Sequence, residues 1–306
     1  MGSLQGRDYL GVRDLSPDEL RHVVDLAAEL KARLRGGEHP PLLRGKILAL
    51  VFEKPSLRTR ATFEAGMWQL GGHAIYLGPQ DIQMGTRESS ADVAKNLQRW
   101  VHGIAARTFD QSTVETLAGN SGVPVINALS DWEHPLQTLA TLQTIQERFG
   151  RLSGTRVAWV GDGNNVLRSL VYAGARLGLS LVIATPEEYG LDSATLAWGR
   201  AAAGSSLDVT DDPIAAVRDA DLIYADVWTS MGQESTAASR RRVFQPYQVN
   251  TALLAHAPAH ALVTHCLPAH RGEEITDEVL DGPRSIAFDE AENRLHVQKA
   301  LLAEVL

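Results

Sequence analysis

A short segment at the start of an expected helix has the residue types that bind phosphate. Residues 56–59 read Ser-Leu-Arg-Thr and follow the apolar run 46–52. Ser56 suits a helix N-cap. The first N–H groups of the helix, the helix dipole and the Arg58 guanidinium would attract an anion. The Ser56 and Thr59 hydroxyls would complete this anion-binding cradle. An ordinary capped helix with solvated arginines fits the spacing equally well. Only five of the 29 basic residues are lysines, so arginine is common in this chain and its presence here is not by itself a signal. The segment is a candidate anion site.

Further polar positions follow expected strands in the same half of the chain. Arg107 comes after the apolar run 103–106. A single arginine at a strand end usually forms a surface ion pair, and Arg107 has a functional role only if it lies near the candidate anion site at residues 56–59. His134 and Gln137 open the next long helix, with Pro135 suited to its first turn. Three residues apart, they share a helix face and can both address one small carbonyl or oxyanion, although a plain polar helix start explains them as well.

The second half opens with a glycine-containing loop. Residues 161–165 read Gly-Asp-Gly-Asn-Asn, like the start of a dinucleotide-binding fingerprint. The third glycine is replaced by Val166, and the next expected strand ends in Thr185-Pro186 with no acidic residue. The pattern therefore disfavours a nicotinamide or flavin cofactor, and the Asn164 and Asn165 amides could instead bind a zwitterionic substrate.

Two later strand ends carry an acid and the only cysteine. Asp226 precedes a Ser-Met-Gly loop and could hold an amine, or simply cap a local turn. Cys266 could be exposed at its strand end, or be a small buried apolar residue. With His265 and His270 it could be read as a metal cluster, but a fourth ligand at usual spacing is missing, so we expect no metal.

These candidates all follow short apolar runs that alternate with longer amphipathic runs, the pattern of a parallel sheet with intervening helices. We expect strands at residues 46–52, 74–77, 103–106, 123–127, 156–160, 181–184, 207–209, 222–225 and 261–265. We expect helices at residues 59–70, 90–101, 112–119, 136–149, 165–177, 194–203, 213–218, 247–255 and 292–305. Loops at the carboxyl ends of parallel strands gather at one edge, where ligands bind.

The length of 306 residues suggests two domains at roughly 150 residues each. The pattern also restarts after residue 150. We therefore expect an α/β fold with two doubly wound parallel-sheet domains, residues 1–150 and 151–289, and a hinge in the polar stretch 151–154.

Composition excludes several classes of protein. The net charge is 29 − 37 = −8, so the chain as a whole does not attract nucleic acid or anionic membranes, and any anionic substrate needs a local basic cluster. A single cysteine cannot form an intramolecular disulfide. No apolar run approaches the roughly 20 residues that cross a bilayer, and the opening segment is unlike a signal peptide. We expect a cytoplasmic protein without nucleic-acid or membrane partners.

Taken together, the loops resemble those of the aspartate/ornithine carbamoyltransferase family. The motifs are Ser-x-Arg-Thr-Arg at 56–60, His-Pro-x-Gln at 134–137, Asp-x-x-x-Ser-Met-Gly at 226–232 and His-Cys-Leu-Pro at 265–268. The last two resemble the ornithine branch, since the aspartate branch would have proline in place of Cys266. Leu57 departs from the pattern, because many relatives carry threonine there, but its backbone N–H can still serve. The resemblance covers nearly the whole chain.

The resemblance implies a carbamoyl phosphate-binding first domain, with the terminal helix 290–306 packing back on it, and an ornithine-binding second domain. It implies a homotrimer, or a multiple of trimers, with active sites at subunit interfaces and with neither metal nor organic cofactor. Carbamoyl phosphate contacts are implied for Ser56, Leu57, Arg58, Thr59, Gln83, Arg107, His134, Gln137, Cys266, Leu267 and Arg294, with Gln83 reaching a neighbouring subunit. Ornithine contacts are implied for Asn165, Asp226, Ser230 and Met231.

The implied reaction moves the carbamoyl group from carbamoyl phosphate to the δ-amine of L-ornithine, giving L-citrulline and phosphate. An amine with a pKa of about 10.4 is neutral in only about one molecule in 2500 at pH 7, so the site must favour loss of a proton. The expected catalytic residues are Arg58, Arg107 and His134, which with Thr59 stabilise the oxyanion, and Asp226 and Cys266, which orient and deprotonate the amine. Two alternatives stay open: a carbamoyltransferase for another amine, such as putrescine or an N-acylated ornithine, and a phosphate-binding module without turnover.

Overall fold

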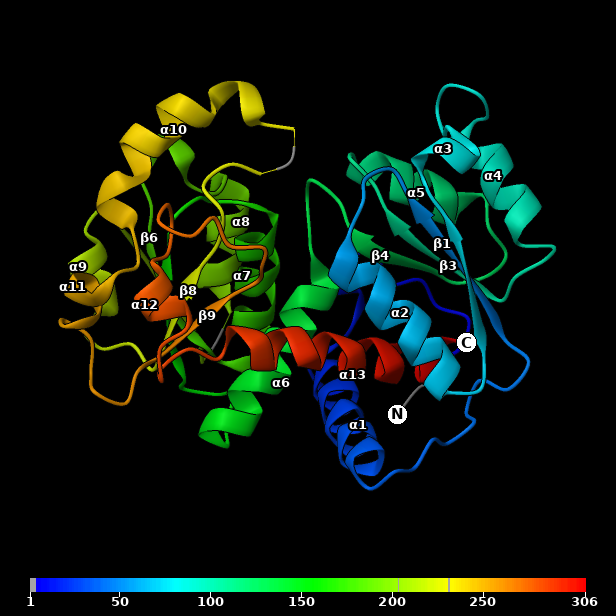
Figure 1. Ribbon diagram of the computed structural model, residues 1–306, viewed down its shortest axis with the longest axis horizontal. Helices are drawn as coiled ribbons and strands as arrows, with labels where there is room; N and C mark the ends of the chain where they lie inside the picture. The colour runs from blue at the N-terminus through cyan, green and yellow to red at the C-terminus, as the bar shows by residue number, and fades with distance from the viewer. Residues whose placement is uncertain (1–3, 203, 231) are drawn as a thin grey trace. The chain divides into compact units, whose positions relative to one another are not determined.

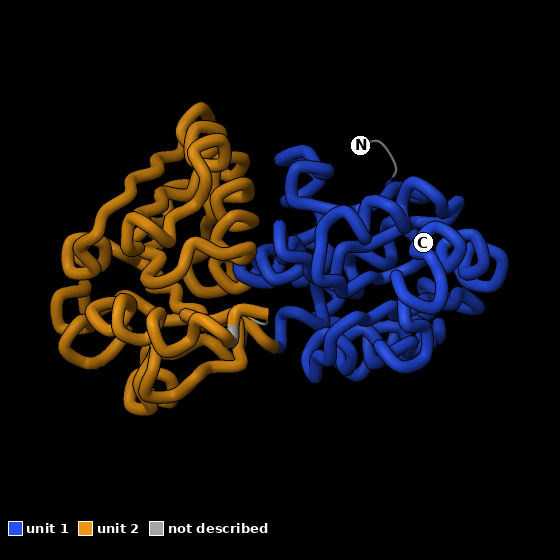
Figure 2. The backbone as a smooth tube through the Cα atoms, turned by 90° about the horizontal axis from the view of Figure 1, so that it is seen from above, with its two compact units in different colours: residues 1–143, 292–306 blue, residues 144–291 orange. Residues whose placement is uncertain are grey.

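The structure is a computed structural model that describes residues 4–202, 204–230 and 232–306. The chain divides into two compact units (Figure 2). Unit 1 comprises residues 1–143 and 292–306, and unit 2 comprises residues 144–291. Two helices, α6 (Pro135–Phe149) and α13 (Ala287–Val305), contain residues of both units.

Unit 1 is built on a four-stranded parallel sheet in the order β2-β1-β3-β4. Its strands are β1 (Ile47–Phe52), β2 (His73–Leu77), β3 (Gly103–Arg107) and β4 (Val125–Leu129). Strand order reverses between β1 and β3, where Phe52 pairs with Arg107. Such a switch point opens a crevice at the carboxyl ends of the two strands, so the loops after β1 and β3 are the expected ligand-binding loops of this unit.

Helices cover both faces of this sheet (Figure 1). One face, with Ala49 and Val51, packs on α4 (Ser90–Leu97) and α5 (Gln111–Gly119) through Val93 and Leu117. On the other side lie α2 (Leu57–Gln69) and the end of α13, which meet where Gly66 lies against Lys299. The remaining elements of this unit are η1 (Val12–Asp14), α1 (Pro17–Arg35) and α3 (Pro79–Ile82).

Unit 2 is built on a five-stranded parallel sheet in the order β7-β6-β5-β8-β9. Its strands are β5 (Arg156–Val160), β6 (Ser180–Ala184), β7 (Ser206–Thr210), β8 (Leu222–Ala225) and β9 (Leu262–His265). The order reverses between β5 and β8, and Ala225 at the end of β8 pairs with His265 at the end of β9. The loops after these three strands therefore share one edge.

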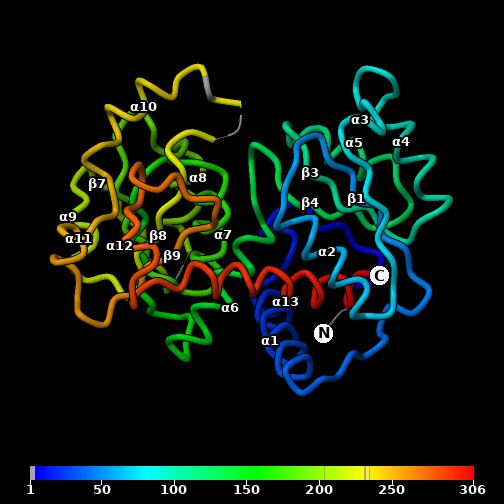
Figure 3. The backbone as a smooth tube through the Cα atoms, viewed as in Figure 1, coloured from blue at the N-terminus to red at the C-terminus, as the bar shows by residue number. Residues whose placement is uncertain are grey.

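Helices again lie on both faces of the second sheet (Figure 3). Gly174 of α7 (Asn165–Leu177) lies against Leu181, and Gly199 of α8 (Ser193–Ala201) lies against Leu207. The opposite face carries a core in which Val160 and Val263 pack with residues of α9 (Pro213–Val217), α10 (Ala237–Phe244), α11 (Thr251–Leu254) and α12 (Asp277–Leu280). Short 3-10 turns are η2 (Glu187–Tyr189), η3 (Glu234–Thr236) and η4 (Gln245–Tyr247).

The prediction of an α/β fold with two doubly wound parallel sheets is confirmed, and each expected strand has a counterpart. The single helix expected at residues 247–255 is wrong. Asn250 caps a separate short helix there, because its side chain accepts the Leu253 N–H, and η4 ends before it. The sequence interpretation also missed helix α1, although Ser16 and Glu19 form a capping box around Pro17 at its start.

In the part of the chain that the structure describes, no helix combines the length and apolar character needed to cross a membrane.

Candidate functional site

In unit 1, the start of α2 has the capped geometry expected from the sequence. Ser56 has extended backbone angles, and its Oγ accepts the Thr59 N–H at 3.3 Å, so the predicted N-cap is confirmed. The same Oγ lies 3.0 Å from the Thr59 hydroxyl. The first N–H groups of the helix, at Leu57 and Arg58, follow the cap and carry the positive end of the helix dipole.

The register of β1 and β3 brings two basic residues next to this helix start. Arg107, the last residue of β3, is buried and pairs with Phe52, the last residue of β1. Lys54, two residues after Phe52, is also buried, and its Nζ lies 4.8 Å from the centre of the Phe109 ring. Burial, with Arg107 adding repulsion, lowers the pKa of Lys54 to about 8. The sequence interpretation did not assign a role to Lys54.

A third basic residue comes from the far end of the chain. Arg294 in α13 is buried, and its Nη1 donates a hydrogen bond to Gln137 Oε1 at 2.7 Å. Its Nη2 donates to Thr59 Oγ1 at 3.1 Å. Arg294 therefore joins the beginnings of α2 and α6, two of the segments that the sequence motifs had singled out.

His134 lies among these cations. Burial is the main reason that the pKa of His134 falls well below 6.5, and the neighbouring positive charges lower it further. Those charges belong to Arg294, Arg107, Lys54 and Arg58. The imidazole is therefore neutral at pH 7 and can act as a hydrogen-bonding group without adding a further charge.

Buried polar contacts hold α13 in unit 1. Lys31 of α1 donates a hydrogen bond from Nζ to Asn293 Oδ1 at 2.7 Å, directly beside Arg294 in sequence. Five residues after Arg294, Lys299 Nζ donates to Gln69 Oε1 of α2 at 2.9 Å. Helix α1, which the sequence interpretation missed, therefore fixes the helix that supplies Arg294.

Two residues implied by the resemblance lie outside this cluster. The Leu57 side chain is 79% exposed, so at this position only the backbone faces the cap. Gln83 is an exposed residue with left-handed backbone angles at the end of α3, and its carbonyl oxygen accepts the Thr86 and Arg87 N–H groups. Its expected role toward a neighbouring subunit stays a prediction.

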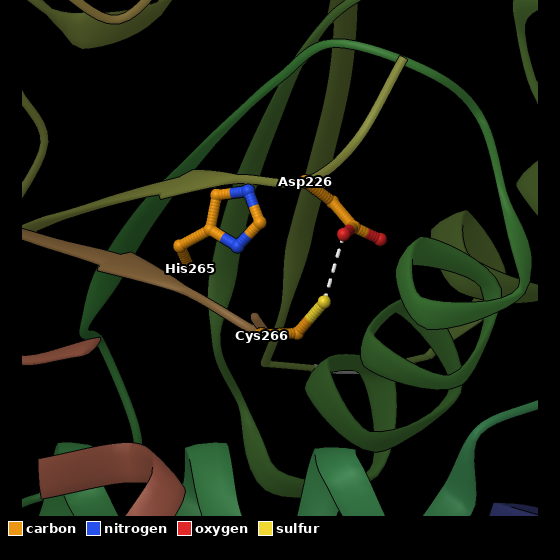
Figure 4. A group of neighbouring side chains, drawn as sticks. All are labelled: Asp226, His265 and Cys266. Atoms are coloured by element: carbon orange, nitrogen blue, oxygen red, sulfur yellow. Dashed lines mark hydrogen bonds between the residues drawn. The ribbon is translucent and has the colours of Figure 1, made fainter. Parts of the chain in front are cut away.

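In unit 2, the end of β8 presents a buried carboxylate. Asp226 Oδ1 accepts the Cys266 thiol at 2.7 Å and the Val227 N–H at 2.8 Å. Its Oδ2 accepts the Asn164 amide at 2.6 Å. Asp226 and Cys266 thus lie together at adjacent strand ends, as expected (Figure 4). Asn164, which caps α7, joins them through its amide.

A second buried acid lies beside Asp226. Asp162 forms an ion pair with Arg240 of α10, and both side chains are buried. Burial raises the pKa of Asp162 to about 6, against the opposing effect of Arg240. Arg240 also donates from Nε to the Trp228 carbonyl and lies 4.7 Å from the centre of the Tyr189 ring. Arg240 therefore ties the loop after β5 to the segment after β8, a role with no signal in the sequence motifs.

The other residues expected around an amino acid ligand lie on the same two loops. Asn165 is the first residue of α7, next to the cap Asn164. Ser230 is half-buried in a turn, where its N–H donates to Gln233 Oε1 at 3.2 Å. The expected ligand contact of Met231 lies outside the described residues.

Side chains that could ligate a metal lie close together at Asp226, His265 and Cys266. The His265 Nε2 is 3.0 Å from Glu274 Oε1, however, and its Nδ1 accepts the Leu267 N–H at 2.8 Å. Both ring nitrogens are therefore engaged in hydrogen bonds, and a metal would have to break one of them. The donor set favours a hydrogen-bonded site over a metal centre.

Comparison with known proteins places the chain in one family. The model of the carbamoyl-P binding domain of aspartate/ornithine carbamoyltransferase matches residues 7–147, and the model of its Asp/Orn binding domain matches residues 153–305. The chain belongs to the aspartate/ornithine carbamoyltransferase family, as the sequence motifs predicted.

Three similar proteins carry the name of the ornithine branch. Ornithine carbamoyltransferase of Thermococcus kodakarensis is 50% identical over 99% of this chain and 98% of its own length. The solved structure of ornithine carbamoyltransferase from Pyrococcus furiosus superposes with a TM-score of 0.97 at 49% identity, over 100% of this chain and 98% of that one. The more distant structure of anabolic ornithine carbamoyltransferase from Campylobacter jejuni is 34% identical, with a TM-score of 0.91 and 97% coverage of both chains.

Proposed function

We propose that the chain transfers the carbamoyl group of carbamoyl phosphate to the δ-amine of L-ornithine, giving L-citrulline and phosphate. Unit 1 would bind the donor and unit 2 the amino acid. The observation that carries the proposal is the basic cluster of unit 1, in which the buried Arg294 hydrogen-bonds Gln137 at the start of α6 and Thr59 at the start of α2. The buried Arg107 ends β3 beside the end of β1, which leads into α2. The names of the full-length relatives point to the same reaction.

The donor is a dianion with a reactive carbonyl, and unit 1 has complementary groups for both parts. Four cations and the start of α2 offer positive charge to the phosphate, in a chain whose net charge is −8. The neutral His134 and the Gln137 amide can hydrogen-bond the carbamoyl group without adding a further charge. As the carbonyl oxygen becomes negative, Arg58, Arg107 and Thr59 can stabilise it, and one such preorganised donor is worth about 3–4 kcal/mol.

The acceptor is a cation that must lose a proton before it reacts. The Asp226 carboxylate, buried and already hydrogen-bonded to Cys266 and Asn164, offers a negative charge to the δ-ammonium group. The δ-ammonium group gives a first proton to this carboxylate, which later returns it to solvent. The neutral nitrogen then forms a bond to the carbonyl carbon and loses a second proton. The bond from that carbon to the phosphate oxygen breaks, and phosphate leaves with the electron pair and can accept the proton.

Three finer points belong to the same proposal. We propose that Ser230 and Met231 with Asn165 bind the amino acid end of ornithine, and that the Cys266 and Leu267 backbone reaches the carbamoyl group. We propose a homotrimer, or a multiple of trimers, in which the exposed Gln83 serves the site of a neighbouring subunit. The lone cysteine is consistent with the cytoplasm as the place of action.

Turnover with carbamoyl phosphate and L-ornithine tests the proposal directly, with citrulline as the product measured. Putrescine and N-acetylornithine are run beside ornithine at equal concentration. We expect ornithine to be carbamoylated at least tenfold faster than either. A faster reaction with another amine would reassign the substrate, and no ureido product from any of the three would leave only an anion-binding protein.

The donor half is tested separately by the substitution Arg58→Gly. Calorimetry should detect carbamoyl phosphate binding to the unaltered protein and none to the variant, because a cation next to the helix start is lost. The matched control is Arg21→Gly, which removes an exposed arginine paired with Asp18 on α1. Equal affinity of the Arg58 variant and the control would remove Arg58 from the site.

A further inference from the structure

The turn that follows β9 is closed by a fully buried carboxylate and imidazole. Glu274 and His265 have side chains that are 0% exposed, and Glu274 Oε1 lies 3.0 Å from His265 Nε2. The same oxygen accepts the His270 N–H at 2.6 Å. One carboxylate oxygen thus holds both ends of the turn, residues 265 and 270.

The proton on His265 has a definite place. Its Nδ1 accepts the backbone N–H of Leu267 at 2.8 Å, so Nδ1 carries no proton. The ring proton must then be on Nε2, where it is donated to Glu274. The hydrogen bonds run in one direction, from Leu267 through His265 to Glu274, and the buried charge of Glu274 orients the ring as a carboxylate commonly does for a functional histidine.

The hydrogen bonds from Leu267 to His265 and from His265 to Glu274, called the relay below, hold an unusual backbone. Leu267 has φ 56°, in the left-handed region that a leucine rarely adopts. The hydrogen bond from its N–H to His265 opposes relaxation to an ordinary conformation. Glu274 itself is fixed, because its carbonyl oxygen accepts the Val249 N–H at 2.8 Å.

Cys266 stands between the two residues that the relay holds. Its thiol points at Asp226, to which Sγ donates at 2.7 Å, and a ring nitrogen of His265 lies within 4.8 Å of both groups (Figure 4). The direction of the thiol therefore depends on the backbone at residues 265–267, and that backbone depends on Glu274.

We propose that Glu274 is a positioning residue for the acceptor site: through His265 it fixes the backbone of Cys266 and Leu267 and so directs the thiol toward Asp226. As far as it concerns catalysis, this inference rests on the proposed function. The tautomer of His265 and the exposure of the Cys266 thiol can be measured without any substrate.

The first test uses the unaltered protein with ¹⁵N-labelled histidines. We expect the His265 ring to give the NMR pattern of the Nε2–H tautomer. An Nδ1–H tautomer, or a doubly protonated ring, would overturn the relay whether or not the protein forms citrulline.

The second test is the substitution Glu274→Gln, which keeps the shape and removes the charge. Because Cys266 is the only cysteine, its rate of alkylation by iodoacetamide reports the thiol alone. We expect this rate to rise at least threefold and the KM for ornithine to rise at least threefold. The Kd of a non-reactive carbamoyl phosphonate should rise by a smaller factor than the KM for ornithine, because the basic cluster of unit 1 is unaltered.

The matched control is Glu273→Gln, the same change at the adjacent residue, which forms a surface ion pair with Arg241 at 2.8 Å. The control should leave both the alkylation rate and the KM for ornithine within twofold. If the Glu274 variant behaves like this control, Glu274 does not position the thiol. Failure of the unaltered protein to form citrulline would instead refute the proposed function, while the tautomer and the alkylation rate still decide the relay.

Discussion

Arg294 donates a 2.7 Å hydrogen bond to Gln137, although 157 positions separate the two residues in the sequence. The contact brings the last helix to the start of α6, and the second nitrogen of the same guanidinium reaches Thr59 at the start of α2. A planar fork with several N–H groups can make both bonds at once, which a single ammonium group cannot do in the same geometry.

The first prediction concerns this fork. Arg294→Lys keeps the charge but loses the two-way contact, so Gln137 and Thr59 are no longer fixed together. We expect the Kd for carbamoyl phosphate, measured by calorimetry, to rise by roughly 10- to 100-fold, in line with about 1.5–3 kcal/mol for a charged hydrogen bond. Arg148→Lys, at an exposed ion pair with Asp289, is the control and should change the Kd less than twofold. An Arg294 variant with the affinity of that control would contradict the structural role.

The second prediction concerns pH. With a pKa of about 8, Lys54 is charged at pH 7 and loses its charge as the pH rises above about 8. The cluster then holds one positive charge fewer, so the KM for carbamoyl phosphate should increase between pH 7.5 and pH 9.5. In Lys54→Arg the charge persists, and the increase should disappear over this range. Lys95→Arg, on the exposed side of α4, should keep the profile of the unaltered protein. An identical profile in all three proteins would assign the titration to another group.

The third prediction concerns the thiol. Cys266→Ala removes the donor of one hydrogen bond to Asp226 but leaves Asn164 and Val227 bound to it. We expect the KM for ornithine to rise at least fivefold, with the affinity for carbamoyl phosphate changed less than twofold. Steady-state kinetics with each substrate varied in turn separates the two effects. Unchanged kinetics for ornithine would mean that the thiol has only a packing role.

The fourth prediction concerns stability. Burial and the nearby lysines Lys299 and Lys31 lower the pKa of His296 to about 4. In the unfolded chain the ring takes up a proton below about pH 6.5, whereas in the folded chain it stays neutral until about pH 4, so folding becomes less favourable as the pH falls through this window. The loss from pH 7 to pH 5 is about 2 kcal/mol. Urea unfolding should detect that dependence, and His296→Gln should remove its share. A variant with the same pH dependence as the unaltered protein would contradict the assignment.

Strand-end loops were the part of the site that the sequence could predict. Parallel strands place their carboxyl ends together, so motifs after β1, β4 and β8 were expected to mark binding loops. Their residue types also predicted an anion site and an amine site. The N-cap at Ser56 and the contact between Asp226 and Cys266 were both anticipated on these grounds.

The residues that were missed depend on burial and register. Lys54 lies in a loop whose residue pattern gives no hint of a role, and it is buried only because Phe52 and Arg107 end their strands side by side. Arg240 and Glu274 lie well beyond the motifs that they support, so no local spacing points to them. Helix α1 did carry a start signal at Ser16 and Pro17, and reading it would have predicted one more helix.

Unit 1 is discontinuous, since its first 143 residues are completed only by residues 292–306. During synthesis, Lys54, Arg107 and His134 leave the ribosome long before Arg294 does. A nascent chain therefore carries an unfinished anion cradle until translation is almost complete, and a product truncated before the last helix would lack both Arg294 and the lysine that joins α13 to α2.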